Sequence, residues 1–287
     1  MRKYHLAALI TITIWGVTFV STRTLLDSGL LPSEIFFIRF VMAYLMLWIF
    51  NPRIELPRSW RDELLFVAVG ATGGSIYFLT ENTALQHTLV SNVGLIVTTA
   101  PLLTAFAAHV SVKGERLHKN LLVGAAVAML GVALVIFNGN FILQLNPLGD
   151  ILALSAAASW AVYTVIIKRL AQKYSMRMIT RRVFFYGIIT LLPWFLYEPM
   201  NISVDLLLET KVWANLLFLG IIASAVCFIV WNVAIKHLGS IRTNNYIYFT
   251  PIVTLLSANI VLGEIITPLA IVGAVLIIGG VYWAERK

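Results

Sequence analysis

The chain has 287 residues, of which 60% are hydrophobic and only 12% carry a charge. Its mean hydropathy of +0.88 reflects more apolar surface than one or two soluble cores could bury, which excludes a soluble globular protein and makes a lipid bilayer the expected solvent. The net charge of +8 is spread over single basic residues and small groups between apolar runs. Because they form no contiguous patch, we expect no nucleic-acid partner.

Residue patterns that support catalysis or metal binding are sparse. The lone cysteine, Cys227, lies in an apolar run, which excludes an intramolecular disulfide and a multi-cysteine metal site. The five histidines have no metal-ligand spacing, and no His-Glu-x-x-His, Gly-x-Ser-x-Gly or Walker motif occurs. We therefore expect no enzyme, no metal and no cofactor, with a membrane enzyme or a channel as remote alternatives.

A helix needs about 20 mainly apolar residues to cross a bilayer, and the chain contains ten such runs. In chain order they predict spans at 4–24, 33–50, 63–85, 90–110, 119–138, 147–168, 179–197, 213–235, 243–262 and 267–284. The first run has a basic start like a signal peptide, but it continues through Phe19 without a small-residue cleavage site, so we expect a first span there. Asn146-Pro147 and Thr267-Pro268 each place a capping side chain before a proline, which predicts two helix starts.

Lysine and arginine are distributed unevenly between alternate loops. One set of loops contains only Lys211, whereas the segments on the side of the N-terminus contain Arg2, Lys3, Arg53, Arg58, Arg61, Lys113, Arg116, Lys119, Lys168, Arg169, Lys173, Arg177, Lys236, Arg242, Arg286 and Lys287. Because loops rich in these residues stay in the cytoplasm, we expect both termini to be cytoplasmic. We expect an integral protein of the bacterial inner (plasma) membrane.

The second half of the chain repeats the first. At an offset of 150 residues, Pro101 aligns with Pro251, and Asn82, Ala84 and His87 align with Asn232, Ala234 and His237. At an offset of 149, Gly114, Glu115, Gly124 and Gly131 align with Gly263, Glu264, Gly273 and Gly280. At an offset of 145, Trp15, Val17, Val20, Arg23 and Leu25 align with Trp160, Val162, Val165, Lys168 and Leu170. Similarity at fixed offsets indicates an internal structural repeat.

The alignment predicts two five-helix units, residues 1–140 and 146–287. Because five is odd, the second unit enters the membrane from the opposite side. The predicted fold class is an all-α membrane protein with ten transmembrane helices as two inverted five-helix repeats around a central cavity, an architecture of secondary transporters. Glu115 and Glu264 each precede the helix that closes a repeat. A carboxylate there stabilises a helix N-terminus, so we interpret both as structural, with gating as the alternative.

Short motifs are distributed along the whole chain. They are Trp15-Gly16-Val17-Thr18-Phe19, Pro32, Arg39, Asn82-Thr83-Ala84-Leu85, Thr88 to Ser91, Pro101, Gly114-Glu115, Gly149-Asp150, Ser159-Trp160-Ala161, Tyr163, Pro251 and Gly263-Glu264. In these motifs and in its ten spans the chain resembles the EamA-type branch of the drug/metabolite transporter superfamily. The resemblance implies a central cavity lined chiefly by spans one, three, four, six, eight and nine, and transport of small metabolites, often outward. Amino acids, nucleotide sugars and other solutes are all cargoes within this family.

Two ionisable side chains lie deep in spans, where a charge is costly and indicates function. Arg39 either pairs with Glu34 or a backbone carbonyl, or binds a cargo carboxylate or acts in gating. Glu81 shares a helix face with Tyr77, and it either carries a proton or a cationic cargo group or is a fixed partner of Arg39.

The remaining candidates are aromatic and polar side chains well inside their spans. We expect the cargo to contact Trp15, Thr18, Tyr77, Glu81, Asn92, Thr99, Trp160, Tyr163, Trp231, Asn245 and Tyr248. This amphipathic, mostly uncharged set suits a small zwitterion with an apolar or aromatic side group better than a phosphate-rich solute. Pro101 and Pro251 fall within spans at equivalent places and predict either hinges or static kinks.

These features predict a secondary transporter of small metabolites that exports amino acids or related solutes by alternating access. An exchanger or facilitator for nucleotide sugars, drugs or other solutes is the alternative. Protons are a candidate coupling ion. The sequence does not determine the oligomeric state, because ten spans can form a complete pathway in one chain.

Overall fold

The computed structural model describes residues 1–50, 52, 55–87, 90–112, 117–137, 146–262 and 265–285, and the regular structure in these ranges is helical. The first half contains α1 (Arg2–Asp27), α2 (Pro32–Phe50), α3 (Trp60–Gly70), the π-helical η1 (Ala71–Ser75), α4 (Ile76–His87), α5 (Val90–Val97), α6 (Ala100–Ser111) and α7 (Lys119–Phe137). The second half contains α8 (Pro147–Leu170), α9 (Met176–Leu191), the 3₁₀-helical η2 (Leu192–Leu196), α10 (Val204–Leu208), α11 (Thr210–Leu217), the π-helical η3 (Phe218–Val226), α12 (Cys227–Leu238), α13 (Ser240–Asn245), the 3₁₀-helical η4 (Tyr246–Phe249), α14 (Thr250–Leu262) and α15 (Pro268–Glu285).

Within the described ranges, eight helical stretches are long and apolar enough to cross a bilayer. They are Arg2–Asp27, Pro32–Phe50, Trp60–His87, Val93–Ser111, Lys119–Phe137, Pro147–Leu170, Met176–Leu196 and Thr210–Leu238, and they coincide with the first eight predicted spans. The ninth predicted span is divided among α13, η4 and α14, and the tenth corresponds to α15, whose apolar part is shorter.

The two helix starts predicted from Asn-Pro and Thr-Pro are confirmed. Asn146 Oδ1 accepts a hydrogen bond from the Gly149 amide at 3.2 Å, and Pro147 is the first residue of α8. Thr267 Oγ1 accepts one from the Ala270 amide at 3.3 Å, immediately before α15. Each cap satisfies an amide that the first helical turn leaves without a backbone partner.

Two long helices change to π-helical geometry at corresponding places. Segment η1 joins α3 to α4, and η3 joins α11 to α12, so that residues 71–75 and residues 221–225, which lie 150 positions further on, have the same geometry. Short π-helical segments inside α-helices are rare and often occur at functional sites.

The two prolines within spans lie at helix starts. Helix α5 ends at Val97 and α6 begins at Ala100, while α14 begins at Thr250 directly after η4. Pro101 and Pro251 are therefore second residues of new helices, where the missing amide of proline removes no backbone hydrogen bond. Each proline therefore coincides with a change in helical structure within its span.

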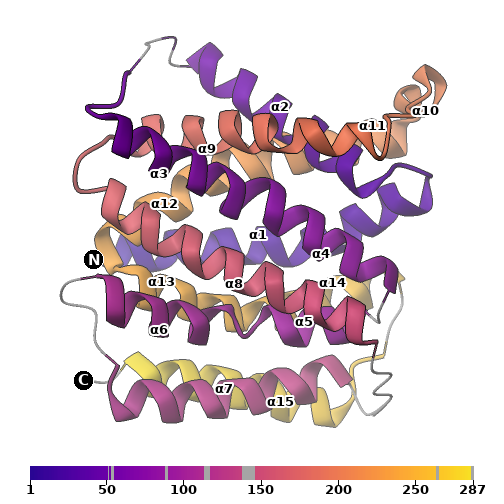
Figure 1. The fold of residues 1–287 in the computed structure, drawn as a ribbon. Coiled ribbons are helices and arrows are strands. Elements are labelled where there is room, and N and C mark those ends of the chain that lie inside the picture. The colour runs from indigo at the N-terminus through magenta and orange to yellow at the C-terminus, as the bar shows by residue number, and fades with distance from the viewer. Residues whose placement is uncertain are drawn as a thin grey trace.

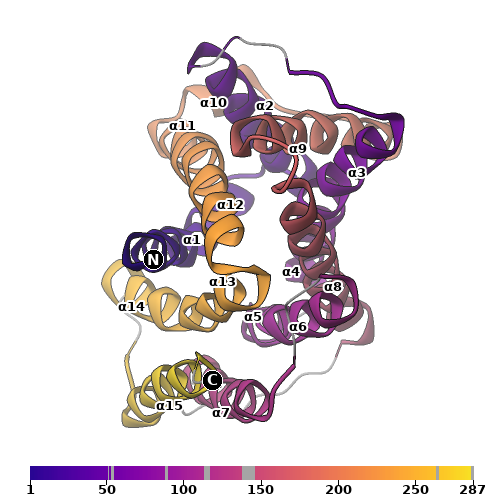
Figure 2. The ribbon, with the colours of Figure 1, turned by 90° about the vertical axis from the view of Figure 1, so that its left-hand side faces the viewer.

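The helices lie roughly side by side in a bundle, with both termini at the same end (Figure 1). Helices α7 and α15 form a pair along one edge in both views, and α2 and α9 lie at the opposite edge (Figure 2). The pair is tightly packed, because a Cβ on Gly131 would lie 2.5 Å from the carbonyl oxygen of Gly273.

The main core between these edges is aromatic. The ring centre of Phe40 lies 4.9 Å from that of Phe184 and 6.0 Å from that of Phe228, which joins α2, α9 and α12. A Cβ on Gly73 would lie 2.2 Å from the ring of Tyr163, so η1 packs directly on α8. This close packing fixes the elements around a central cavity.

Candidate functional site

A cavity of about 510 Å³ lies among α1, α4, α5, α6, α7, α8 and α14, with Arg39 of α2 and Phe228 of α12 also in its wall. This volume is typical of a site for one small metabolite. The cavity follows the second half of α1 as far as Arg23, whose side chain is 61% exposed. It therefore opens toward the end of the bundle opposite the termini (Figure 1).

Aromatic side chains form the inner part of the cavity wall. The ring centre of Trp160 lies 5.5 Å from that of Trp15 and 5.3 Å from that of Tyr77. The ring centre of Phe228 lies 5.7 Å from that of Trp15. The indole nitrogen of Trp15 donates a hydrogen bond to the carbonyl oxygen of Ala223 at 2.8 Å. These contacts hold the rings in place and leave an apolar surface for a ligand to pack on.

Two groups of opposite charge line the same cavity and are held by different partners. Glu81 Oε1 accepts a hydrogen bond from the Tyr77 hydroxyl at 2.7 Å. Arg39 donates from Nε to Ser224 Oγ at 2.9 Å, and its guanidinium carbon lies 4.5 Å from the ring centre of Phe78. No ion pair within 4.0 Å joins Arg39 to Glu81 in the described chain. The two charges therefore stay separate at the cavity.

Glu34, the alternative partner of Arg39, accepts hydrogen bonds from backbone amides instead. The Glu34 carboxylate accepts hydrogen bonds from the Leu31 amide at 2.8 Å and the Asn201 amide at 2.7 Å. It caps the start of α2 and ties it to the loop before α10. Arg39 makes its side-chain hydrogen bond to Ser224 instead.

The structure brings some of the predicted site residues together and separates others from the cavity. The residues in the cavity wall are Trp15, Thr18, Arg39, Tyr77, Glu81, Trp160 and Pro251. The residues outside it are Thr99, Pro101, Tyr163, Trp231, Asn245 and Tyr248. The Asn92 side chain lies outside the described part of the chain, as do Glu115 and Glu264.

Several of the residues outside the wall are buried in packing. The Tyr163 hydroxyl donates to Asn232 Oδ1 at 2.7 Å, and Asn232 in turn donates to Thr180 at 3.0 Å. Trp231 is fully buried, with its ring centre 5.0 Å from that of Trp15. Tyr163 and Trp231 therefore pack behind Trp160 and Trp15, which line the cavity.

Sequence reasoning missed Asn82, Thr98 and Phe78 as parts of the wall and Ser224 as the partner of Arg39. Asn82 had a signal, because it aligns with Asn232 in the repeat. Ser224 shares a helix face with Gly220 and Trp231 by its spacing, but its contact with Arg39 depends on which helix faces meet, and Phe78 had no signal in the local pattern.

The end of the bundle that carries the termini is closed by polar contacts. Trp160 donates from its indole nitrogen to Asn244 Oδ1 at 3.0 Å. Closer to the termini, His5 Nδ1 lies 2.7 Å from the Tyr246 hydroxyl, and the rings of Tyr4 and His237 stack at 4.0 Å. These contacts join α1, α8, α12, α13 and η4 below the cavity.

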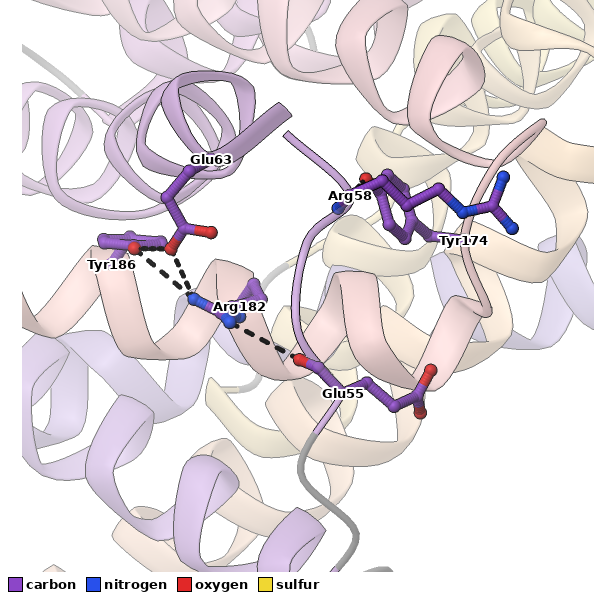
Figure 3. A network of polar contacts seen from close by, with 6 residues as sticks. All are labelled: Glu55, Arg58, Glu63, Tyr174, Arg182 and Tyr186. Atoms are coloured by element: carbon purple, nitrogen blue, oxygen red, sulfur yellow. Dashed lines mark hydrogen bonds and ion pairs between the residues drawn. The ribbon is translucent and has the colours of Figure 1, made fainter. Parts of the chain in front are cut away.

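A second polar network, away from the cavity, joins α3 to α9 at the same end (Figure 3). Glu63 accepts hydrogen bonds from Arg182 and Tyr186, and Arg182 also donates to the Glu55 carbonyl at 3.4 Å. The Arg58 amide donates to the Tyr174 hydroxyl at 2.8 Å. Burial raises the pKa of the Tyr174 hydroxyl, which also donates to Asp62 Oδ2 at 2.7 Å. The network fixes the loop before α3 against the start of α9.

Comparisons with known proteins agree on one family. The profile of the EamA-like transporter family matches the chain twice, at residues 2–137 and 147–285. The chain therefore belongs to the EamA-like transporter family. It is an integral membrane transporter of small molecules and not an enzyme.

Individual relatives are similar along their whole length. An uncharacterized transporter of Archaeoglobus fulgidus is 29% identical over 99% of this chain and 98% of its own. A probable terminal-alkyne amino-acid exporter of Streptantibioticus cattleyicolor is 28% identical over 100% of this chain and 95% of its own. A probable amino-acid metabolite efflux pump of Salmonella typhimurium is 26% identical over 98% of this chain and 94% of its own.

A solved crystal structure has the same fold. It superposes with a TM-score of 0.81 over 99% of this chain and 97% of its own, at 17% sequence identity. At this identity the likeness concerns the arrangement of helices alone.

Proposed function

We propose that this protein is a secondary transporter that exports amino acids or closely related zwitterionic metabolites by alternating access. The observation that carries the proposal is the presence of one guanidinium, Arg39, and one carboxylate, Glu81, not bonded to each other, in a cavity lined mainly by aromatic and uncharged residues. A zwitterion satisfies both charges at once. The other charged group in the wall, Arg23, is already paired with Asp27. Two relatives, named as a probable amino-acid exporter and a probable amino-acid metabolite efflux pump, support the same cargo class.

In this proposal each part of the cargo has its own partner. Arg39 binds the carboxylate through its Nη groups, because its Nε is already directed at Ser224. Glu81 binds the ammonium group. The apolar side group packs on Trp15, Trp160 and Tyr77, with Thr18 at the edge. A phosphate-rich solute is disfavoured, since it would need several available cations, and of the two arginines in the wall Arg23 is paired with Asp27.

The architecture we propose is ten spans in two inverted five-helix repeats, residues 1–140 and 146–287. The separate family matches to the two halves support it. The π-helical segments η1 and η3 fall at equivalent positions in the two halves, which supports it further.

The α7 and α15 pair gives the strongest support for inversion. Gly124 meets Gly280, and Gly131 meets Gly273. Exchanging repeat-equivalent residues turns the first contact into the second. Because the two helices are antiparallel, an axis that exchanges them must lie across the helices, in the plane of a membrane that they span.

With the N-terminus in the cytoplasm of a bacterial cell, the structure would represent the outward-open state. Inward opening would then break the contacts beneath the cavity and expose Tyr163, Trp231, Asn245 and Tyr248 to the cargo. We propose Pro101 and Pro251 as hinges for this change, because each begins a helix after an interruption in its span. Coupling through Glu81 is part of the proposal, with a proton as the coupling ion.

Counterflow in proteoliposomes tests the transport activity. Vesicles loaded with unlabelled phenylalanine should take up labelled phenylalanine from outside transiently and in a saturable manner, while protein-free vesicles should not. A channel would equilibrate the label without an overshoot. A parallel thermal-shift screen should find stabilisation by amino acids, because a bound cargo stabilises the folded state by mass action. Stabilisation by nucleotide sugars alone, with no amino-acid counterflow, would refute the cargo class.

A further inference from the structure

Lys168 ties two helices together at the closed end of the bundle. It lies in the last turn of α8 and donates from Nζ to the carbonyl oxygens of Ile235 at 3.3 Å and Lys236 at 3.1 Å. Both carbonyls are in the last turn of α12, where the helix end is electronegative, and the Ile235 carbonyl also accepts from the Gly239 amide at 3.0 Å. A cation at this point therefore stabilises the contact between α8 and α12.

The repeat places equivalent residues at the open end of the bundle, but there the cation does not contact the helix end. Arg23 aligns with Lys168 at the offset of 145, and Leu85 and Gln86 align with Ile235 and Lys236 at the offset of 150. Leu85 and Gln86 lie in the last turn of α4. Arg23 pairs instead with Asp27 of its own helix, at 2.9 Å. Both Arg23 and Leu85 line the cavity, which separates α1 from the end of α4.

A second pair of equivalent residues shows the same asymmetry. At the closed end Tyr163 donates to Asn232. The counterpart of Tyr163 at the offset of 145 is Thr18, and the counterpart of Asn232 is Asn82. Thr18 donates to the Trp15 carbonyl within its own helix, at 2.6 Å, and Thr18 and Asn82 both line the cavity. The contact present in one half is therefore absent from the other.

We propose that Arg23 holds the cavity closed at its outer end, which we call the outer gate, and we call this contact of Arg23 the latch. When the cavity closes at the Arg23 end, the guanidinium leaves Asp27 and binds the carbonyl oxygens of Leu85 and Gln86. At the same time Lys168 releases the end of α12, and the opposite end opens. The exchange is energetically easy, because the Arg23 and Asp27 side chains are 61% and 54% exposed and such a pair is weak. The inference rests on the proposed inverted repeat and adds the residues that hold each gate.

Cysteine cross-linking tests the geometry directly. Cys227 is the only cysteine, so Cys227→Ala gives a cysteine-free background. In it, the pair Arg23→Cys with Gln86→Cys should form a disulfide under mild oxidation, block counterflow, and regain counterflow on reduction. The pair Asp27→Cys with Gln86→Cys, one helical turn away, serves as the matched control and should cross-link several-fold less. The pair Lys168→Cys with Lys236→Cys should cross-link most readily without cargo.

Charge variants test the energetics. Lys168→Gln should lower the labelling rate of a cysteine at Asn82 by an impermeant maleimide, because it favours closure of the outer gate. Arg23→Gln in the same protein should restore that rate. We expect each effect to be about tenfold, as for the loss of one hydrogen bond to a charged group. Arg23→Lys, which carries the cation of its counterpart, should behave like the parent.

The results distinguish failure of the latch proposal from failure of the proposed transport function. If the parent shows counterflow but the 23 and 86 cysteines never cross-link, or if Arg23→Gln leaves labelling unchanged, the latch is wrong and the transporter stands. If Asp27→Asn reproduces every effect of Arg23→Gln, the ion pair on α1 matters and the latch is again wrong. If the parent shows no counterflow, the proposed function itself fails.

Discussion

Gly124 of α7 and Gly280 of α15 approach so closely that a Cβ on Gly124 would lie 2.4 Å from the Gly280 carbonyl oxygen. A Cβ on Gly280 would in turn lie 2.6 Å from the Gly124 carbonyl oxygen. The obstacle is backbone on both sides, which cannot move aside as a flexible side chain can. Small residues at such a crossing let two membrane helices pack backbone to backbone.

We therefore expect Gly280→Val to separate α7 from α15 and to lower the free energy of unfolding by ~1–3 kcal/mol. The matched control is Gly279→Val on the same helix, because a Cβ on Gly279 meets nothing within 4 Å. Thermal unfolding of the detergent-solubilised protein measures both. Equal midpoints for the two variants would contradict the role of the close contact.

A substitution at Glu81 should impair transport. Glu81→Gln removes the negative charge that we assign to the cargo ammonium group, while its side chain can still accept the Tyr77 hydrogen bond. We expect counterflow of phenylalanine to fall by at least about tenfold, in line with the loss of one charge-assisted contact. Tyr77→Phe keeps the charge and should cost less. A Glu81→Gln protein with parental rates and parental pH dependence would refute the assignment.

Arg39 should determine whether the cargo needs a carboxylate. The parent should prefer phenylalanine over phenethylamine, which has the same ring and amine but no carboxylate. Arg39→Gln should reduce that preference by about ten- to a hundredfold, because the lost contact is a hydrogen bond to a charged group worth ~1.5–3 kcal/mol. Competition with labelled phenylalanine measures the preference. An unchanged ratio would mean that Arg39 serves packing on Phe78 and not cargo binding.

The network of Glu63, Arg182 and Tyr186 should contribute to stability and not to cargo choice. The Glu63 and Arg182 side chains are each 18% exposed, so a substitution leaves a largely buried charge without its partner. We expect Glu63→Gln to lower the free energy of unfolding by ~1–3 kcal/mol. The exposed pair of Arg23 and Asp27 supplies the control, and Asp27→Asn should cost ~0–1 kcal/mol. Competition profiles should be the same in both variants, and a changed cargo preference in Glu63→Gln would contradict a purely structural role.

The sequence predicts the helices of this protein well, because hydrocarbon length and helix caps are local properties. The first eight predicted spans match apolar helices, and the caps at Asn146 and Thr267 form as expected. Intramembrane charge also has a local signal, which marks Arg39 and Glu81 as candidates, and both lie in the cavity wall.

The helix faces could not be predicted in the same way. Spans that are apolar all round give no periodicity to separate a lipid-facing side from a packed side. The sequence therefore places Trp15 and Trp231 in one group, although one lines the cavity and the other is buried beneath it. The partnership of Arg39 with Ser224 depends on how α2 meets η3, which no local pattern contains.

The close contact between α7 and α15 also limits when this part of the fold can form during synthesis of the chain. Helix α7 ends at residue 137 and α15 begins at residue 268, so about 130 residues must be made before the two can meet. At ~5–20 residues per second the ribosome needs roughly 7–26 s for this stretch. During that time the glycine face of α7 lacks the helix that packs on it, and this edge of the bundle stays incomplete until α15 has been made.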